Sequence, residues 1–171
     1  MGFFDLFKKK SNEEATNKQV LLAKVLFNNH ETFELKVLVD HLKNEWKSSI
    51  TNINGGNGKA SFQLNGKTVI LTTVTERIHF AEMESNASIA YNWDTAEKDL
   101  KNHNVHVVVT VLESQHDEIE KAEVHNIVLA SILTTTKCIG IYHLSQQLII
   151  PSKAFLEIAQ KVKNSDLPNW D

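Results

Sequence analysis

The side chains of this chain with the clearest capacity for chemistry are imidazoles and carboxylates. The chain contains eight histidines, and His79 with Glu82, and His103 with His106, lie close together in sequence. Imidazole nitrogens and carboxylate oxygens bind zinc and other divalent ions, so a His/Glu cleft is one hypothesis. His103 and His106 are three residues apart on a predicted extended chain, which directs their side chains to opposite faces. The single cysteine, Cys138, excludes a thiolate-rich site, and we predict no metal site and no cofactor.

Residues that would form a covalent or phosphate-binding site are not arranged for that chemistry. Cys138 lies in the apolar run CIGIY, where thiols are usually inert, and the chain has no G-x-S-x-G motif. The runs Gly58-Lys59 and Gly66-Lys67 lack the earlier glycine of a phosphate loop, because Ile53 and Ser61 stand at those positions. We therefore interpret both runs as turns and predict no catalytic residue.

Composition and charge limit the classes of partner. At 171 residues, with 42% hydrophobic and 23% charged residues, the chain is long enough for one domain with a sizeable core. The net charge is −3 and Arg77 is the single arginine, whereas nucleic-acid surfaces favour bidentate arginine contacts. We therefore expect no nucleic-acid partner. A lone cysteine indicates a reducing cytoplasm as the simplest setting.

The N-terminal stretch MGFFDLFKKK is short, and Asp5 interrupts its apolar run. It does not fit a signal peptide or a membrane span. Its phenylalanines and lysines predict at most a weak contact with an anionic membrane, without stable insertion. We interpret residues 1–18 as a flexible tail and residues 19–171 as a single α+β domain.

The Val-rich stretch 105–113 is the clearest buried strand, because apolar and β-branched residues fall on both of its faces. The Asn65-Gly66 pair predicts a hairpin, residues 50–58 read as a loop, and residues 76–93 form a less regular segment. Thr32, Asp94, Asp117 and Ser152 are the predicted helix caps. The predicted strands are 20–27, 59–64, 67–75, 105–113, 139–144 and 147–150, and the predicted helices are 32–47, 94–102, 117–135 and one that starts at 152.

This order of elements predicts the fold. Its first part, βαββαβ, is the pattern of a ferredoxin-like split β-α-β core, with residues 20–27 and 105–113 as parallel central strands. A further helix, a second hairpin and a C-terminal helix extend that core. We expect Val107, Val109, Ile127 and Leu133 to be almost fully buried. The inward side of the last helix is predicted to carry Phe155, Ala159 and Val162.

A resemblance to a known family rests on the run YNWDTAEKDLKNHNVHVVVTVLES, the long helix after it, and the run CIGIYHLSQQLIIPSKAFLEIAQ. Over roughly residues 76–171 the chain resembles the bacterial domain of unknown function 4261. The family pattern of tryptophan, histidine, Gly-aromatic strand and proline is matched as follows: Trp93, His103 or His106, Gly140, Tyr142 and Pro151. The chain departs from it at residues 83–88, where the family often has a proline-rich stretch. The resemblance implies a fold and no known activity.

Two functions from different classes remain. The first is a non-catalytic binding or accessory module, of an immunity type or another protein-interaction type, with another protein as partner and self-association left open. The alternative is a hydrolase or ligand-binding enzyme that uses a His/Glu cleft, with or without a metal. We expect Trp170 to cover an apolar patch on its own domain or on a partner. The candidate binding residues are His79, Glu82, Trp93, His103, His106 and Trp170.

Overall fold

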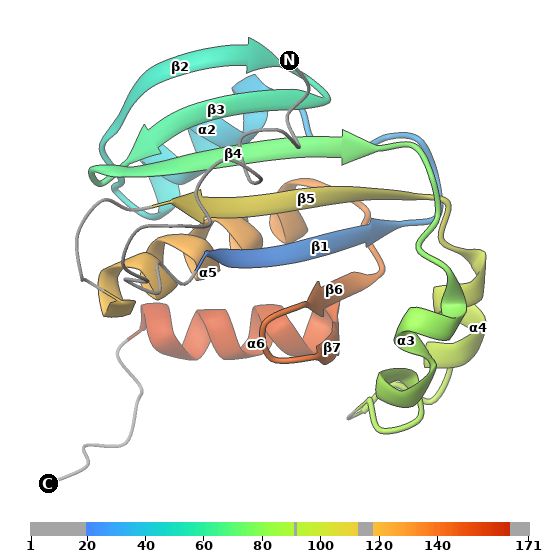
Figure 1. The fold of residues 1–171 in the computed structure, drawn as a ribbon. Helices are drawn as coiled ribbons and strands as arrows, with labels where there is room; N and C mark the ends of the chain where they lie inside the picture. The colour runs from blue at the N-terminus through green and yellow to red at the C-terminus, as the bar shows by residue number, and fades with distance from the viewer. Residues whose placement is uncertain (1–19, 91, 113–117, 165–171) are drawn as a thin grey trace, which may run out of the picture.

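The computed structural model describes residues 20–90, 92–112 and 118–164 (Figure 1). The predicted tail (residues 1–18), the predicted cap Asp117 and the candidate binding residue Trp170 lie outside the described residues. Within the described part, the fold is α+β and is built on one sheet of seven antiparallel strands in the order β2-β3-β4-β5-β1-β6-β7. The strands are β1 (Leu21–Phe27), β2 (Ile50–Gly56), β3 (Lys59–Leu64), β4 (Lys67–Val74), β5 (Val105–Leu112), β6 (Gly140–His143) and β7 (Leu148–Pro151).

The prediction of two parallel central strands is wrong. β1 and β5 are adjacent but antiparallel, with Val25 opposite Val107. The cause is β2, which replaces the loop predicted at 50–58: the additional strand changes the direction in which each later strand runs. The sheet is therefore larger than a simple ferredoxin-like sheet, and the ferredoxin-like arrangement is not confirmed.

The sequence did not predict β2, because this strand is irregular. Its pairing with β3 shifts register between Thr51 and Asn54, and Asn52 has a left-handed backbone with φ of 52°. This irregularity in an edge strand rich in Asn and Gly removes the alternation by which strands are recognised. In contrast, the hairpin at Asn65-Gly66 is confirmed, with φ values of 50° and 83° that suit a type I′ turn.

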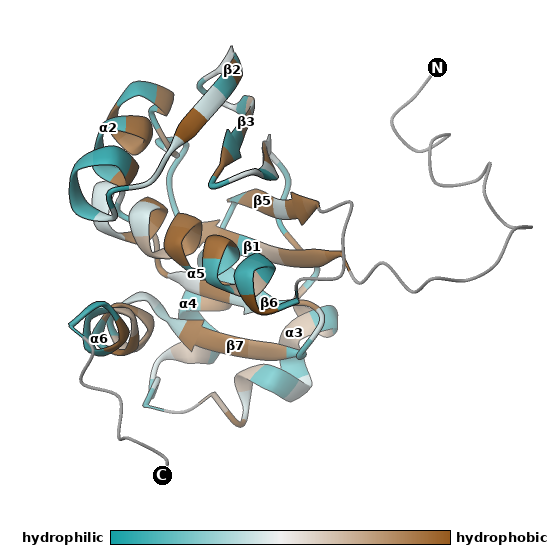
Figure 2. Cartoon of the chain, turned by 90° about the vertical axis from the view of Figure 1, so that its left-hand side faces the viewer, coloured by the Kyte–Doolittle hydropathy of each residue, from teal (hydrophilic) through white to brown (hydrophobic). Residues whose placement is uncertain are grey.

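Three helices cover one face of the sheet, as Figures 1 and 2 show. They are α2 (Leu35–Glu45), α5 (Glu118–Thr135) and α6 (Ser152–Lys163). Val107 and Val109 of β5 are completely buried beneath them, and Ile127 and Leu133 of α5 are 8% and 4% exposed. The predicted core residues are therefore confirmed.

The predicted helix caps and one core position need correction. α2 starts after Glu34, and the Thr32 hydroxyl lies 3.3 Å from that of Thr73 in place of capping the helix. α4 (Ala96–Asn102) starts after Thr95 without a side-chain cap, so Asp94 is not its cap. Ser152 is the first helical residue of α6, and its hydroxyl donates to the Cys138 carbonyl. Val162 is 49% exposed, although it follows buried Phe155 by two turns on the same side of α6, because it stands next to the last residue of the helix.

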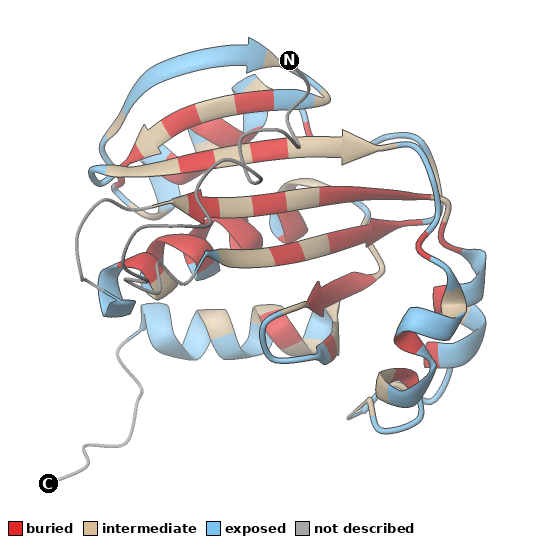
Figure 3. Ribbon diagram, viewed as in Figure 1, coloured by how far each residue is buried: buried red, intermediate tan, exposed pale blue. Residues whose placement is uncertain are grey.

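Among the described residues, helices cover the opposite face of the sheet only at its β6–β7 end. There α3 (Phe80–Ala87), inside the segment predicted to be irregular, and α4 pack against a second apolar cluster that includes Leu26, Tyr142 and Ile149. Elsewhere on this face Val108, Thr110 and Leu112 are half-buried (Figure 3). Within the described residues, the prediction that β5 is a buried strand therefore holds fully on the face beneath α2, α5 and α6, and in part on the other face.

Candidate functional site

A cleft of about 440 Å³ lies between α3 and α4. We call it the α3–α4 cleft. Its apolar lining residues are Phe80, Ala87, Ala90, Trp93 and Ala96. Its polar lining residues are Glu84, Ser88, Asp94 and Glu97. Clefts of roughly 300–1,000 Å³ with an apolar lining and a few polar groups are typical of binding sites.

Trp93 is the largest side chain of the cleft and is held in place from two sides. Its indole N–H donates to Oδ2 of Asp99 at 2.8 Å, and the Thr95 hydroxyl donates to the same oxygen at 2.6 Å. The indole ring also packs against Gly140 of β6: a Cβ atom at Gly140 would lie 2.7 Å from the ring. Glycine is therefore needed at position 140 for the ring to occupy this place.

Carboxylates give the cleft its charge. Glu84 is on α3, Asp94 precedes α4, and Glu97 is in the first turn of α4. Glu97 pairs with Lys101 one turn later, and the Lys101 ammonium lies 4.7 Å from the centre of the Phe80 ring. Neither Glu84 nor Asp94 has a cationic partner among the described residues.

His103 links the start of α3 to the end of α4. Its Nε2 accepts the backbone N–H of Ile78 at 2.9 Å, and its Nδ1 donates to the carbonyl of Leu100. Burial lowers the pKa of His103, so the ring is neutral at pH 7. Both ring nitrogens are used, and no lone pair remains for a metal or a substrate proton.

His106 has the same neutral state but a different environment. Its Nδ1 donates to the Glu76 carbonyl at 3.0 Å, which leaves the lone pair on Nε2. Burial, and secondly the Lys24 ammonium, lower the pKa of His106 to about 4. Nε2 has no hydrogen-bond partner among the described residues. Of the two buried site histidines, His106 is therefore the one whose described contacts leave a ring nitrogen available as an acceptor.

The structure does not gather the predicted site residues into one cleft. His79 and Glu82 are exposed at the start of α3, and Trp93 lines the α3–α4 cleft. His103 and His106 are buried and do not line it. The expected opposite orientation of His103 and His106 does not apply, because the strand begins only at Val105. No group of three or more His, Cys, Asp and Glu residues within the described ranges is arranged to hold a metal ion.

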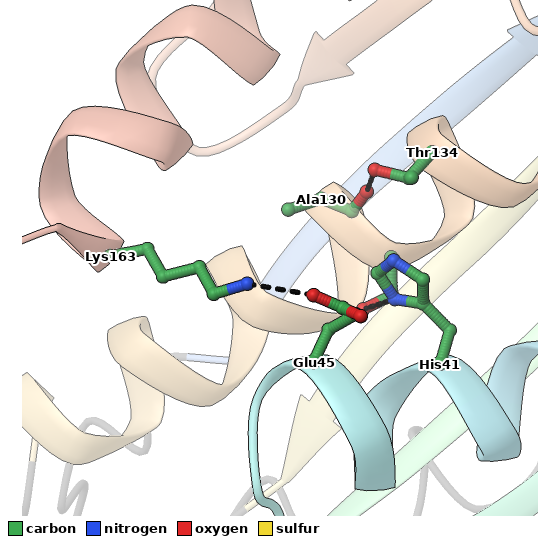
Figure 4. A network of polar contacts seen from close by, with 6 residues as sticks. His41, Glu45, Ala130, Thr134 and Lys163 are labelled. Atoms are coloured by element: carbon green, nitrogen blue, oxygen red, sulfur yellow. Dashed lines mark hydrogen bonds and ion pairs between the residues drawn. The ribbon is translucent and has the colours of Figure 1, made fainter.

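One polar network was missed by sequence reasoning because its residues lie far apart in the chain. Where α2, α5 and α6 meet, Nδ1 of His41 lies 3.1 Å from the Ser131 hydroxyl, and Lys163 donates to Glu45 at 3.0 Å (Figure 4). Ser131 is completely buried, so it cannot reach a substrate as a nucleophile. The Lys163 ammonium also lies 5.4 Å from the Trp46 ring centre. This network links the three helices, and we assign it no catalytic or binding role.

Two further groups with chemical capacity are also structural. The His125 and His143 rings meet edge to face at 5.1 Å between centroids, inside the core. Burial raises the pKa of the Cys138 thiol, which keeps it protonated and poorly reactive. The predicted inertness of Cys138 agrees with this environment.

Comparison with known proteins adds no relative. No family model, no curated protein and no solved structure matches the chain. The resemblance to the domain of unknown function 4261 therefore stays a prediction. None of the helices in the described ranges is long and apolar enough to cross a membrane.

Proposed function

We propose that the chain is a non-catalytic cytoplasmic binding module, of the accessory or immunity type, that holds another protein in the α3–α4 cleft. The observation that carries this proposal is the cleft itself, which is lined by apolar side chains and three carboxylates and contains a tryptophan held by Asp99 and Gly140. Tryptophan in a partly desolvated pocket is the type of residue that dominates binding energy at protein interfaces. The resemblance to the domain of unknown function 4261 belongs to the same proposal, because Trp93 and Gly140 are among the residues that carry it.

The buried histidines support binding over catalysis. His103 uses both ring nitrogens to join Ile78 to Leu100, and His125 lies in the core against His143. A general base needs a ring nitrogen within reach of a substrate proton. Neither ring offers one in these contacts, so these two histidines serve the fold.

The test compares two matched substitutions. Ser88 is exposed and lines the cleft, and Ser145 is exposed in the turn between β6 and β7. Ser88→Phe fills the cleft, and Ser145→Phe adds the same ring elsewhere. We expect a protein that co-purifies with the wild-type chain to be retained by the Ser145→Phe variant and lost by the Ser88→Phe variant. Equal retention by both variants, with unchanged melting temperatures, would place the binding surface outside the cleft.

A second candidate, a ligand-binding enzyme or hydrolase, is favoured by one observation. His106 is neutral and keeps its Nε2 lone pair, with Lys24 and Glu82 near enough to affect its pKa. In this function, His106 would accept a proton or a hydrogen bond from a small substrate. A turnover that is abolished by His106→Gln and unaffected by Ser88→Phe would favour this candidate over the binding module.

A further inference from the structure

The lining of the α3–α4 cleft is acidic. Three carboxylates, Glu84, Asp94 and Glu97, belong to it, and no lysine, arginine or histidine is among its described lining residues. All three carboxylates are exposed to water, which weakens each charge, but their location around one cleft gives it a negative potential. The charge complement of such a cleft is a cation.

The chain itself provides a cation for two of the lining residues, Glu97 and Phe80. The Lys101 ammonium pairs with Glu97 and lies over the Phe80 ring. An aromatic face and a carboxylate act together on this ammonium, as in cation–π recognition. Phe80 and Glu97 are therefore already in contact with a cation of the protein itself.

The rest of the lining provides the same kinds of group without a cation. Trp93 provides the aromatic ring, and Asp94 and Glu84 provide carboxylates that have no cationic partner among the described residues. Asp99 and Gly140 hold the Trp93 ring in place before any ligand arrives. A fixed ring lowers the entropic cost of binding, and tryptophan is the best aromatic partner for a cation.

On the premise of the proposed function, we infer that the α3–α4 cleft receives a basic side chain, arginine or lysine, from the partner protein. Its guanidinium or ammonium group is held by the Glu84 and Asp94 carboxylates, and its aliphatic stem lies on Trp93. Lys101 occupies the neighbouring carboxylate, Glu97, and so limits the negative charge that the partner meets. The identity of the partner is thereby narrowed to proteins that present an exposed basic residue.

The test uses blocked pentapeptides of glycine with one central arginine or one central citrulline, which has nearly the same shape and no charge. The readout is the ¹H–¹⁵N signal of the Trp93 indole, identified by its loss in Trp93→Phe. We expect the arginine peptide to shift this signal in a saturable way, and the citrulline peptide to bind at least tenfold more weakly. Equal binding of the two peptides, or no shift with arginine, would overturn the inference.

Matched variants test which carboxylates bind the arginine of the peptide. Glu84→Gln with Asp94→Asn should weaken the arginine peptide at least tenfold, whereas Glu31→Gln with Asp40→Asn, exposed acids elsewhere, makes the same change in net charge and should have little effect. Lys101→Met should tighten binding severalfold because it releases Glu97, and Lys98→Met on the same helix should not. If the two members of either pair changed the affinity for the peptide equally, the peptide would be responding to the overall charge of the protein. That result would overturn the inference.

The outcomes also separate this inference from the proposed function. Loss of a partner by Ser88→Phe together with no binding of the arginine peptide would overturn the basic-residue inference and leave the binding module in place. Retention of the partner by Ser88→Phe would remove the cleft from the proposed function, and the inference with it.

Discussion

On one face of the sheet, helices of 11, 18 and 12 residues cover the central strands, while on the other face helices of 8 and 7 residues cover one end. The larger cluster contains long periodic elements and completely buried residues such as Phe62, Leu42 and Leu129. The smaller cluster is completed by polar links through His103 and Asp99. The difference shows how the chain divides its tasks: apolar burial makes the domain stable, and a few directed hydrogen bonds shape the cleft.

The largest expected effect concerns the larger cluster. Leu129 of α5 is completely buried there, and Leu129→Ala should lower the free energy of unfolding by about 2–5 kcal/mol. Chemical denaturation measures this loss. If the α3–α4 pair opens as a separate unit, native-state hydrogen exchange of Leu129→Ala should be faster in β5 and unchanged in α3 and α4.

Leu100→Ala is the matched control, since Leu100 is equally buried but in the smaller cluster. This substitution should accelerate exchange in α3 and α4 and in β5, because global unfolding also exposes Leu100. Faster exchange of α3 and α4 in the Leu129→Ala variant would mean that the two clusters open together and that the comparison fails.

The second effect is a dependence of stability on pH. His125 lies in the larger cluster, where burial and then His143 lower its pKa to about 4, and His106 lies at the margin of the smaller one, with its pKa also lowered to about 4. Both folded-state values lie below the unfolded value near 6.5. The unfolded chain therefore binds protons first, so stability is complete above about pH 6.5 and is lost as the pH falls toward 4, by roughly 1–3 kcal/mol for each histidine.

Urea denaturation at several pH values between 7 and 4 checks this dependence. His125→Gln and His106→Gln should each flatten it, whereas His30→Gln, at an exposed position, should leave it nearly unchanged. If stability depended on pH in all three variants as it does in the wild-type chain, protonation of carboxylates would have to be the source of that dependence.

A third effect concerns the support of Trp93. In Gly140→Ala, the new Cβ would lie 2.7 Å from the Ile150 carbonyl oxygen and equally close to the Trp93 ring. We expect a loss of about 1–3 kcal/mol and a shifted Trp93 indole NMR signal. Gly56→Ala is the control, because a Cβ there meets nothing within 4 Å. An unchanged indole signal in Gly140→Ala would show that Gly140 does not position the ring.

The smallest effect is expected at the junction of α2, α5 and α6. Glu45→Gln removes the ion pair with Lys163, but both side chains are substantially exposed. Ion pairs of this kind contribute little in water, so the melting temperature should stay within experimental error at physiological salt. A clear drop would mean that the junction, and with it the larger face, depends on polar contacts as the smaller cluster does.

The two regions also differ in what their sequence predicts. The larger cluster was predicted because the alternation of Val107 and Val109 and the apolar spacing around Ile127 persist over whole elements. The direction of β5 was not predicted, because β2 has no such alternation around Asn52. For the cleft, the resemblance alone singled out Trp93, which lines the cleft in the structure, and its role in binding stays a prediction. Asp94 was predicted only as a helix cap, and Glu84 was not among the predicted binding residues, because an exposed carboxylate has no local signature until the fold places it in a cleft.

His103 has a consequence for how this chain could vary or be engineered. Its ring links Ile78, just before α3, to Leu100 in the last turn of α4, so the two helices are fastened at the end nearest the sheet. The connection between Ala87 and Ala96 lies at the far end, as Figure 1 shows. That connection contains Ser88, Ala90, Trp93 and Asp94, which line the cleft. Substitutions there would change the cleft directly, while His103 keeps the two helices together at their other end. Partner choice could therefore diverge through this one connection while the sheet stays the same.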